Sequence, residues 1–301
     1  MMKVLVFGAI NKDYIYSVDH IVSPGETISC FNNSITWGGK GFNQAVAAAQ
    51  GGAVTSLACK IHSSDEGEAG ELLMKYGIFN DYLRVCDIAT GKAIIQVDHE
   101  GQNCIIVCPD ANRTITDDFV DHTLAGFSKG DILLLQNEIN NISYIMQKAS
   151  ERGMYIVFNP SPFEKHLLEL PLAVVDTFVL NEIECKELTG ETDYDKMQHK
   201  MMFLFPQARI VLTLGKHGVI YRDKDISLTH GIYDVPVMDT TAAGDTFTGF
   251  FAAHYYKTHD PKESLRIASV ASSLAVSRKG AAISIPNIQE VLSSNLQEIV
   301  L

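Results

Sequence analysis

A short run of small residues between two carboxylates carries the clearest chemical signal in the 301-residue sequence. Residues 239–247 read DTTAAGDTF and lead into a helical pattern. Small residues let the backbone turn tightly, and the N–H groups of a first helical turn carry partial positive charge, so the run predicts an anion hole. A carboxylate beside it, Asp245, suits accepting a hydroxyl proton during phosphoryl transfer. A capping carboxylate at the helix N-terminus is an equally good interpretation of Asp245.

Two stretches near the N-terminus have residue types that could hold a second ligand. Residues 38–45 read GGKGFNQA and open a helix, and their three glycines allow a ligand to approach the backbone closely. Lys40 and Asn43 could hydrogen-bond that ligand. The triplet at 11–13, Asn-Lys-Asp, follows the first strand and so lies at the carboxyl edge of a sheet, the usual ligand edge. A flexible loop and a plain turn are the structural alternatives.

Two further stretches could serve a nucleotide. Asn181 and Glu184 follow a strand and share one face if a helix begins there, where a carboxylate and an amide could orient water around Mg²⁺. The same spacing is that of a capping box, which needs no ligand. Residues 213–218, TLGKHG, form a glycine-rich turn that either passes under phosphates or is only a hairpin.

Strands and helices must position these residues, and their patterns alternate along most of the chain. Short apolar runs predict buried strands at 4–8, 54–59, 131–136, 155–159, 177–180 and 209–214. Helical periodicity occurs at 44–50, 70–76, 143–152, 244–257, 261–277 and 287–297. Continuous apolar strands that alternate with helices predict an α/β fold with a mainly parallel sheet and helices on both faces.

Residues 12–36 and 92–109 interrupt this alternation. The second stretch carries two strand patterns, 93–97 and 104–108, on either side of a polar turn, which predicts a hairpin. We therefore expect a small antiparallel β lid at 12–36 and 92–109, on a body formed by 1–11, 37–91 and 110–301. A lid beside the carboxyl edge of the sheet suits closure over a ligand.

Composition and missing motifs exclude several classes of function. Twenty-four Lys and Arg oppose 36 Asp and Glu, a net charge of −12, which argues against nucleic-acid binding. No apolar stretch approaches the roughly 18 residues of a membrane span, and Asn11 and Asp13 come too early for a secretory signal. The six cysteines form no C-x-x-C pair, as expected of reduced thiols in the cytoplasm. The Walker, dinucleotide and G-x-S-x-G motifs are absent.

Taken in order, these motifs resemble those of the ribokinase (PfkB-type) family of sugar kinases over essentially the whole chain. The resemblance implies a kinase that uses ATP and Mg²⁺ to phosphorylate a primary hydroxyl of a small sugar, most simply ribose. It implies that Asp245 is the catalytic base, beside an anion hole. That hole comprises Ala242, Ala243 and Gly244. The sugar would contact Asn11, Asp13, Gly39, Lys40, Gly41, Asn43, Glu138 and Asp245.

The resemblance also implies a nucleotide site and a monovalent cation site. The nucleotide would be lined by Asn181, Thr213, Leu214, Gly215, Lys216, His217, Gly218 and Gly244, with Glu184 ordering the water shell of Mg²⁺. The cation, usually potassium, would lie beside the anion hole and hold its loop in shape. The matching positions are Asp239, Thr241, Ala275, Arg278, Gly280 and Ser284, several of them through backbone carbonyls.

The chain departs from the family pattern at two places. His62-Ser63-Ser64 replaces the usual Gly-Asp-Asp, and Lys92, Gln96 and Pro109 differ from a ribose-specific lid in the region expected to cover the sugar. A nucleoside or modified-sugar kinase is therefore the alternative, and a non-catalytic sugar sensor is the interpretation from a different class. The exposed strand edges of a lid predict a homodimer joined through the lids.

Overall fold

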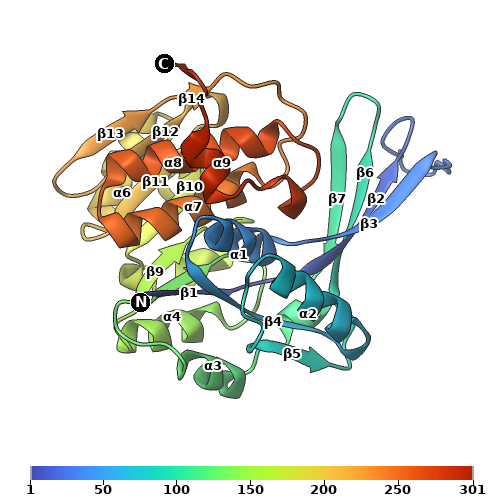
Figure 1. Cartoon of the computed structure of the whole chain (residues 1–301), viewed down its shortest axis with the longest axis horizontal. Coiled ribbons are helices and arrows are strands. Elements are labelled where there is room, and N and C mark those ends of the chain that lie inside the picture. Colours follow the sequence, from blue (N-terminus) through green and yellow to red (C-terminus); the bar gives the residue numbers. More distant parts are fainter. Residues whose placement is uncertain (1, 300–301) are drawn as a thin grey trace.

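Nine strands form the central sheet of the computed structural model, which describes residues 2–299 (Figure 1). Their order is β13-β12-β11-β10-β9-β8-β1-β4-β5, parallel from β5 to β11 and antiparallel at β12 and β13. The strands are β1 (Lys3–Phe7), β4 (Val54–His62), β5 (Leu83–Cys86), β8 (Ile132–Leu135), β9 (Tyr155–Phe158), β10 (Thr177–Asn181), β11 (Arg209–Thr213), β12 (Val219–Arg222) and β13 (Ser227–His230). The mainly parallel sheet predicted from the apolar runs is confirmed.

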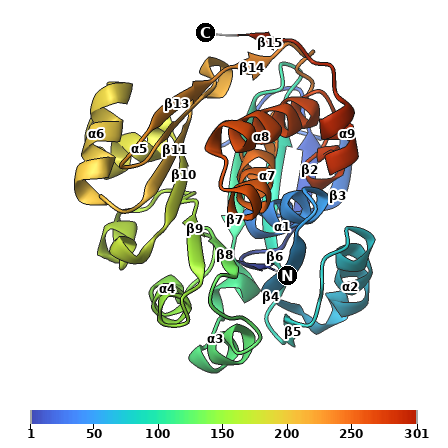
Figure 2. The same cartoon turned by 60° about the vertical axis from the view of Figure 1, so that its left-hand side comes forward.

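Helices cover both faces of this sheet (Figure 2). Val4 and Val6 of β1 pack into one core, and Leu5 and Phe7 pack into the other, because successive side chains of a strand point to opposite faces. The first core is covered by α1 (Lys40–Gln50), α2 (Glu66–Lys75), α7 (Ala243–Thr258), α8 (Pro261–Val276) and α9 (Ile288–Ser293). The second is covered by α3 (Asp117–Leu124), α4 (Ile142–Glu151), α5 (Glu182–Thr189) and α6 (Tyr194–Leu204).

A second, four-stranded sheet projects from the side of the body (Figure 1). Its order is β3-β2-β6-β7, from β2 (Asn11–Ser17), β3 (Asn32–Gly38), β6 (Gly91–Val97) and β7 (Asn103–Cys108). The predicted hairpin is the antiparallel pair β6–β7. The β2–β3 pair is also antiparallel, whereas β2 and β6 run parallel.

The C-terminal part differs in one respect from its helical pattern. Helix α9 ends at Ser293, where the C-cap residue Ser294 is extended, so the helix expected to reach 297 is shorter. The chain then pairs β15 (Glu298–Ile299) with β14 (Ile232–Tyr233). Among residues 2–299, no helix combines the length and the apolarity needed to cross a membrane.

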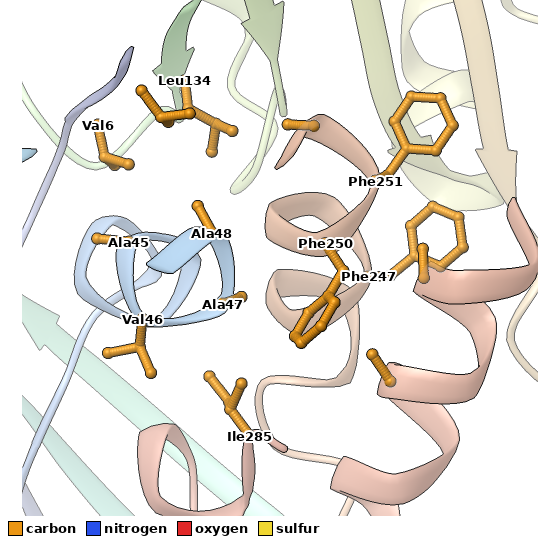
Figure 3. Close-up of a cluster of buried hydrophobic side chains, with 14 of the residues drawn as sticks. Val6, Ala45, Val46, Ala47, Ala48, Leu134, Phe247, Phe250, Phe251 and Ile285 are labelled. Carbon is orange, nitrogen blue, oxygen red and sulfur yellow. The ribbon is translucent and has the colours of Figure 1, made fainter. Parts of the chain in front are cut away.

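Helices α1 and α7 pack closely against each other (Figure 3). Alanines 45, 47 and 48 of α1 are fully buried, and Phe250 and Phe251 of α7 belong to the same core cluster. Gly249 lies at the contact, where a Cβ atom would come within 2.7 Å of Ala48 N and of Gln44 O. Small residues on both helices thus let the first turn of α1 lie beside the first turn of α7.

Candidate active site

The carboxylate of Asp245 is buried in the first turn of α7 and faces α1. Its Oδ1 accepts a hydrogen bond from Gln44 Nε2 at 2.9 Å, and its Oδ2 accepts one from Asn43 Nδ2 at 3.1 Å. Lys40 Nζ lies 3.9 Å from Oδ1. The N-cap residue of α7 is Ala242, and no side chain caps the helix. The capping interpretation of Asp245 is therefore wrong, because the carboxylate is bound by side chains of α1.

The backbone that precedes Asp245 leaves open space at the N-terminus of α7. Ala242 has the left-handed φ of 59°, which an L-residue adopts only at a cost of about 1–2 kcal/mol. Gly244 is exposed, and a Cβ added to it would meet no atom within 4 Å. The N–H groups of a first helical turn have no acceptor within the helix. Ala243 N donates to Thr240 O at 3.2 Å, so it is beside Gly244 that an anion would meet unused N–H groups of this turn.

The glycines around Lys40 allow the start of α1 to touch the end of β1. Gly39 has a φ of 93°, and a Cβ on Gly41 would lie 2.5 Å from Ala9 N. This close approach leaves the Lys40 N–H pointing at Glu138, whose Oε2 accepts it at 2.7 Å. Lys40 and Glu138, both predicted as sugar contacts, are therefore hydrogen-bonded to each other at the start of α1.

Asn11 and Asp13 reach the cleft from strand β2 of the small sheet. Asn11 is buried, and its Oδ1 accepts a hydrogen bond from Asn112 Nδ2 at 2.8 Å, so its own amide nitrogen faces Gly39. The Asp13 carboxylate occupies the space that a side chain at Gly38 would need. Two of the predicted sugar contacts therefore come from the small sheet.

Burial and like charge raise the pKa of two carboxyl groups in this cleft. The pKa of Asp13 is raised to about 7, by burial and then by the charge of Glu138. Burial raises the pKa of Glu138 to about 7 as well, although Lys40 opposes the shift. For Lys40, burial lowers the pKa, but the carboxylates of Asp245, Glu138 and Glu184 outweigh burial and hold it above its usual value. The cleft thus concentrates negative charge around one ammonium group.

Asn181 and Glu184 form the capping box at the start of α5. Asn181 Oδ1 accepts from the N–H of Glu184 at 2.9 Å, and Glu184 Oε2 accepts from the N–H of Asn181 at 3.0 Å. The structural alternative for this pair is therefore present. Both residues also line a pocket of about 540 Å³, with Phe163, Glu164, Lys165, Ile183 and Glu187.

The glycine-rich turn lies beside Asn181 because β10 and β11 are parallel neighbours. Asn181 is in register with Thr213, the last residue of β11. The turn continues through Leu214, Gly215, Lys216 and His217 to Gly218. Gly215 and Gly218 both have positive φ, and Leu214 N donates to Gly218 O at 2.8 Å. The predicted nucleotide residues thus meet at one edge of the sheet.

Asp239 ties the loop before α7 to the segment after α8. Its Oδ1 accepts from Thr241 N at 2.9 Å and from Thr241 Oγ1 at 2.5 Å, and its Oδ2 accepts from Gly280 N at 2.9 Å. Burial raises the pKa of Asp239, but these hydrogen bonds outweigh burial and lower it below its ordinary value. Asp239, Thr241 and Gly280, predicted to share a cation site, are therefore in direct contact.

The remaining predicted cation ligands lie on the same segment. Arg278 Nη2 donates to Glu290 Oε1 of α9 at 2.6 Å, and its backbone N–H donates to Ala275 O at 3.0 Å. Ser284 Oγ donates to Ala281 O at 2.8 Å. Within residues 2–299, no group of three or more His, Cys, Asp or Glu side chains is arranged to hold a metal ion. A cation here would depend on backbone and hydroxyl oxygens beside the single carboxylate of Asp239.

Comparison with known proteins identifies the family. Residues 1–288 match the model of the pfkB family carbohydrate kinases. The chain belongs to this family. It is 35% identical to the ribokinase of Haemophilus influenzae, over 97% of this chain and 98% of that protein, and 33% identical to the ribokinase of Staphylococcus aureus, over 96% and 98%.

Solved structures agree with the assignment of this chain to the carbohydrate kinase family. A ribokinase from Thermotoga maritima superimposes with a TM-score of 0.86 at 31% identity, covering 97% of this chain and 99% of that one. An Arabidopsis thaliana ribokinase complexed with ribose and ATP gives a TM-score of 0.84 at 28% identity, over 97% and 98%. A Burkholderia thailandensis nucleoside kinase shares the fold at 19% identity.

Several polar residues of the kinase's cleft were not predicted. Gln44 binds Asp245 directly, while Gln136 and Asn159 bind Gln44. Asn112 orients Asn11. Gln136 and Asn159 are each the last residue of a predicted strand. Their position at the carboxyl edge of the sheet could therefore have marked them as candidate site residues.

Lys92 and Gln96, two of the residues that depart from the ribose-specific pattern, lie on the other face of the small sheet from Asp13. Asp13 is paired with Ala93, whereas Lys12 is paired with Lys92 and thus shares the opposite face of the small sheet. Lys92 binds Asp110 at 3.1 Å. Gln96 shares the face of Lys92 and accepts a hydrogen bond from the N–H of Val22 at 3.0 Å. Lys92 and Gln96 therefore lie on the face of the small sheet opposite Asp13.

The turn that replaces Gly-Asp-Asp retains a carboxylate one residue later. His62 Nδ1 is hydrogen-bonded to Ser64 Oγ at 2.8 Å. Asp65 then accepts from Lys12 Nζ at 2.6 Å and from Thr90 Oγ1 at 2.5 Å. Asp65 thus connects this turn to β2 of the small sheet.

Proposed function

We propose that this carbohydrate kinase transfers the γ-phosphoryl group of ATP to the primary hydroxyl of ribose, giving ribose 5-phosphate. The single observation that carries the proposal is the position of Asp245, between the open N-terminus of α7 and the polar groups of α1. The similarity to ribokinases over nearly the full chain supports ribose as the acceptor. A cytoplasmic location, where ATP is available, is part of the same proposal.

Asp245 would act as the general base in this reaction. Its carboxylate accepts the proton of the attacking hydroxyl, while the N–H groups around Ala243 and Gly244 stabilise negative charge on the transferring phosphoryl group. Phosphoryl transfer needs little covalent help, so positioning and charge stabilisation supply most of the rate. Asn43 Oδ1 is buried without a partner among the described residues, which suits accepting a hydrogen bond from a sugar hydroxyl.

The small sheet would serve as a lid over the sugar, with residues 12–36 and 92–109 moving against the body. Asn11 and Asp13 support this role, because they reach the cleft from β2. Gly39, Lys40, Gly41 and Glu138 would bind the sugar from the side of the body. Closure excludes water that would otherwise accept the phosphoryl group.

Mg²⁺ would be held chiefly by the nucleotide's phosphates and by water. Such a site needs only one or two carboxylates, which agrees with the lack of a larger ligand cluster among the described residues. Glu184 suits ordering the water shell because only its Oε2 is used in the capping box. The bound ion would neutralise charge on the phosphates.

A potassium ion beside the loop 239–241 would keep the anion hole in shape. The contacts of Asp239 with Thr241 and Gly280 support this proposal, because they join the two segments that would supply carbonyl oxygens. We expect turnover to rise on adding K⁺ at constant ionic strength. Equal turnover in K⁺ and in tetramethylammonium would contradict the cation site.

The test of the function is ADP release with Mg-ATP across pentoses, hexoses, deoxy sugars and nucleosides. We expect ribose to give the highest kcat/KM, and Asp245→Asn to lower kcat by about 10²–10⁴-fold without unfolding the protein. Asp176→Asn is the matched control, since Asp176 lies at the opposite edge of the sheet, where it accepts the N–H of Ile156 at 2.8 Å. If a nucleoside were the best substrate, the proposed acceptor would be a nucleoside instead of ribose. Near-normal turnover of Asp245→Asn would refute the role of Asp245 as the base.

A homodimer joined through the lids is part of the proposal. The edge strands β3 and β7 carry exposed apolar residues, with Ile35 61% exposed and Ile105 and Val107 each 50% exposed. Exposed apolar edges of this kind favour pairing with a second copy. Light scattering should give a dimeric mass that falls with Val107→Lys but not with Phe203→Lys, a control on α6. A monomeric mass for the unaltered protein would overturn the dimer.

A further inference from the structure

A line of buried side-chain amides connects the central sheet to Asp245. Asn159 Nδ2 donates to the carbonyl oxygen of Val179 at 2.9 Å, and Asn159 Oδ1 accepts from Gln44 Nε2 at 3.1 Å. Gln44 Nε2 also donates to Asp245 Oδ1 at 2.9 Å, while Gln44 Oε1 accepts from Gln136 Nε2 at 2.6 Å. Gln44, Gln136 and Asp245 are each at most 6% exposed.

The hydrogen bonds of this line fix which way each amide faces. A backbone carbonyl only accepts, so the amide nitrogen of Asn159 must face Val179 and its oxygen must face Gln44. The nitrogen of Gln44 then donates both to Asn159 and to Asp245, and its oxygen is left for Gln136. A flipped Gln44 amide would bring its oxygen against the carboxylate. The orientation of Gln44 is therefore set from the backbone of β10.

The line is anchored on rigid elements. Gln136 and Asn159 directly follow β8 and β9, and Gln44 lies in the first turns of α1. Gly8 makes room for Gln136, because a Cβ on Gly8 would lie 2.5 Å from Gln136 Oε1. Groups held by strands and helices position a reacting side chain more accurately than groups on loops.

We propose that Gln44 is a positioning residue, which fixes the rotation of the Asp245 carboxylate so that its free lone pairs face the sugar hydroxyl. The inference rests on the proposed function, in which Asp245 is the base. The terminal torsion of an aspartate is soft, so a carboxylate held only through Oδ2, by Asn43 Nδ2 at 3.1 Å, can still rotate once the donor to Oδ1 is removed. Misplacement of a reacting group by about 1 Å can cost roughly 100-fold in rate.

A purely structural role is the competing explanation. Gln44 could simply fill buried space and satisfy Gln136. Gln44→Leu removes the donor, while Gln44→Glu keeps the size and still accepts from Gln136. The introduced carboxyl donates to Asp245 only while it is protonated. Burial and the carboxylates of Asp245 and Glu138 should raise its pKa above the usual value of about 4.3, while the Lys40 ammonium, 3.9 Å from Asp245 Oδ1, opposes the shift. Gln44→Leu tests the loss of the donor without adding a charge, and a positioning role further requires that the activity of Gln44→Glu fall as this proton is lost.

The experiment measures kcat and KM from pH 5.5 to 8.5 for the unaltered enzyme and for Gln44→Leu, Gln44→Glu, Gln198→Leu and Asp245→Asn. We expect Gln44→Leu to lower kcat by about 10- to 100-fold at every pH, the effect of losing a hydrogen bond to a charged group, with KM for ribose within threefold. We expect Gln44→Glu to lose at least about tenfold in kcat, relative to the unaltered enzyme, as pH rises across this range. Gln198→Leu, at a buried glutamine of α6, should leave kcat unchanged.

The outcomes separate this inference from the proposed function. A folded Gln44→Leu with normal kcat, beside an inactive Asp245→Asn, overturns the positioning role alone. A Gln44→Glu profile parallel to that of the unaltered enzyme does the same, and it decides the question if Gln44→Leu does not fold. An active Asp245→Asn, or no sugar-dependent ADP release by the unaltered enzyme, instead refutes the proposed function.

Discussion

Two glycines of α7 should respond in opposite ways to the same added methyl group. Gly244 is exposed, and a Cβ there would meet no atom within 4 Å. Gly249 faces α1, where a Cβ would come within 2.7 Å of Ala48 N and of Gln44 O. Because alanine favours a helix over glycine by about 0.5–1 kcal/mol, Gly244→Ala should leave the free energy of unfolding unchanged or raise it by that amount. Gly249→Ala should lower it by about 1–3 kcal/mol through overpacking.

The two glycine substitutions should lower catalysis in different ways. The methyl group of Gly244→Ala would project into the space where the phosphoryl group is expected, and losing one donor of such a hole costs about 10²–10³-fold in kcat. Gly249→Ala would lower kcat only by moving α1, which carries Asn43 and Gln44. Gly244→Ala is therefore expected to be a stable enzyme with little turnover.

The assay pairs thermal unfolding with ADP release. A gain of about 0.5–1 kcal/mol corresponds to an increase of about 1–3 °C in Tm for a chain of this size. We expect Gly244→Ala to match or exceed the Tm of the unaltered enzyme and Gly249→Ala to fall below it. Normal kcat for Gly244→Ala would show that the transferring phosphoryl group does not contact this residue. A lower Tm for Gly244→Ala would refute the claim that the space above it is open.

Three further predictions concern the cleft. Because the pKa of Asp13 is raised to about 7, the folded state favours its neutral form, so this residue lowers the free energy of unfolding as pH rises from about 4 to 7. In urea unfolding, Asp13→Asn should therefore be more stable than the unaltered protein at pH 8 and not at pH 4. The gain in unfolding free energy should be at most about 1.4 kcal/mol for each pH unit between the unfolded and folded pKa values of Asp13. The same stability difference at pH 4 and at pH 8 would contradict the raised pKa. Gly38→Ala should displace the Asp13 carboxylate and raise the KM for ribose at least about tenfold, with the KM for ATP unchanged. Gly8→Ala should push the Gln136 amide away and lower kcat in the same direction as Gln44→Leu, and normal kinetics would argue against the amide line.

Local patterns predicted the elements and the segments that form the cleft. Strand and helix alternation placed residues 181–184 and 213–218 at one edge of a parallel sheet, and the structure has them there. Residues 11–13 were expected at the same edge, but they begin strand β2 of the small sheet. What local patterns do not contain is the order of strands and the facing of helices. Gln44 and Asp245 are 201 residues apart in sequence, and only the contact between α1 and α7 joins them. The capping interpretation of Asp245 was wrong for this reason.

The sequence placed Lys92 and Gln96 in the lid but assigned them to neither face, because strand register was unknown. Side chains alternate between faces, so a position can be assigned only when its partner is known. The pairing of Asp13 with Ala93 puts Lys92 and Gln96 on the other face.

Two departures from local conformational rules lie side by side at the proposed anion hole. Ala242 adopts a left-handed conformation that glycine would adopt without strain, while Gly244 is a helical glycine that nothing in the described chain crowds. Thr246 Oγ1 donates to Ala242 O at 2.8 Å, and Asp239 holds Thr241, so the strained turn is braced on both sides. Strain of this kind persists only when its surroundings determine it. The turn is therefore formed before phosphate arrives, as electrostatic stabilisation of phosphoryl transfer requires.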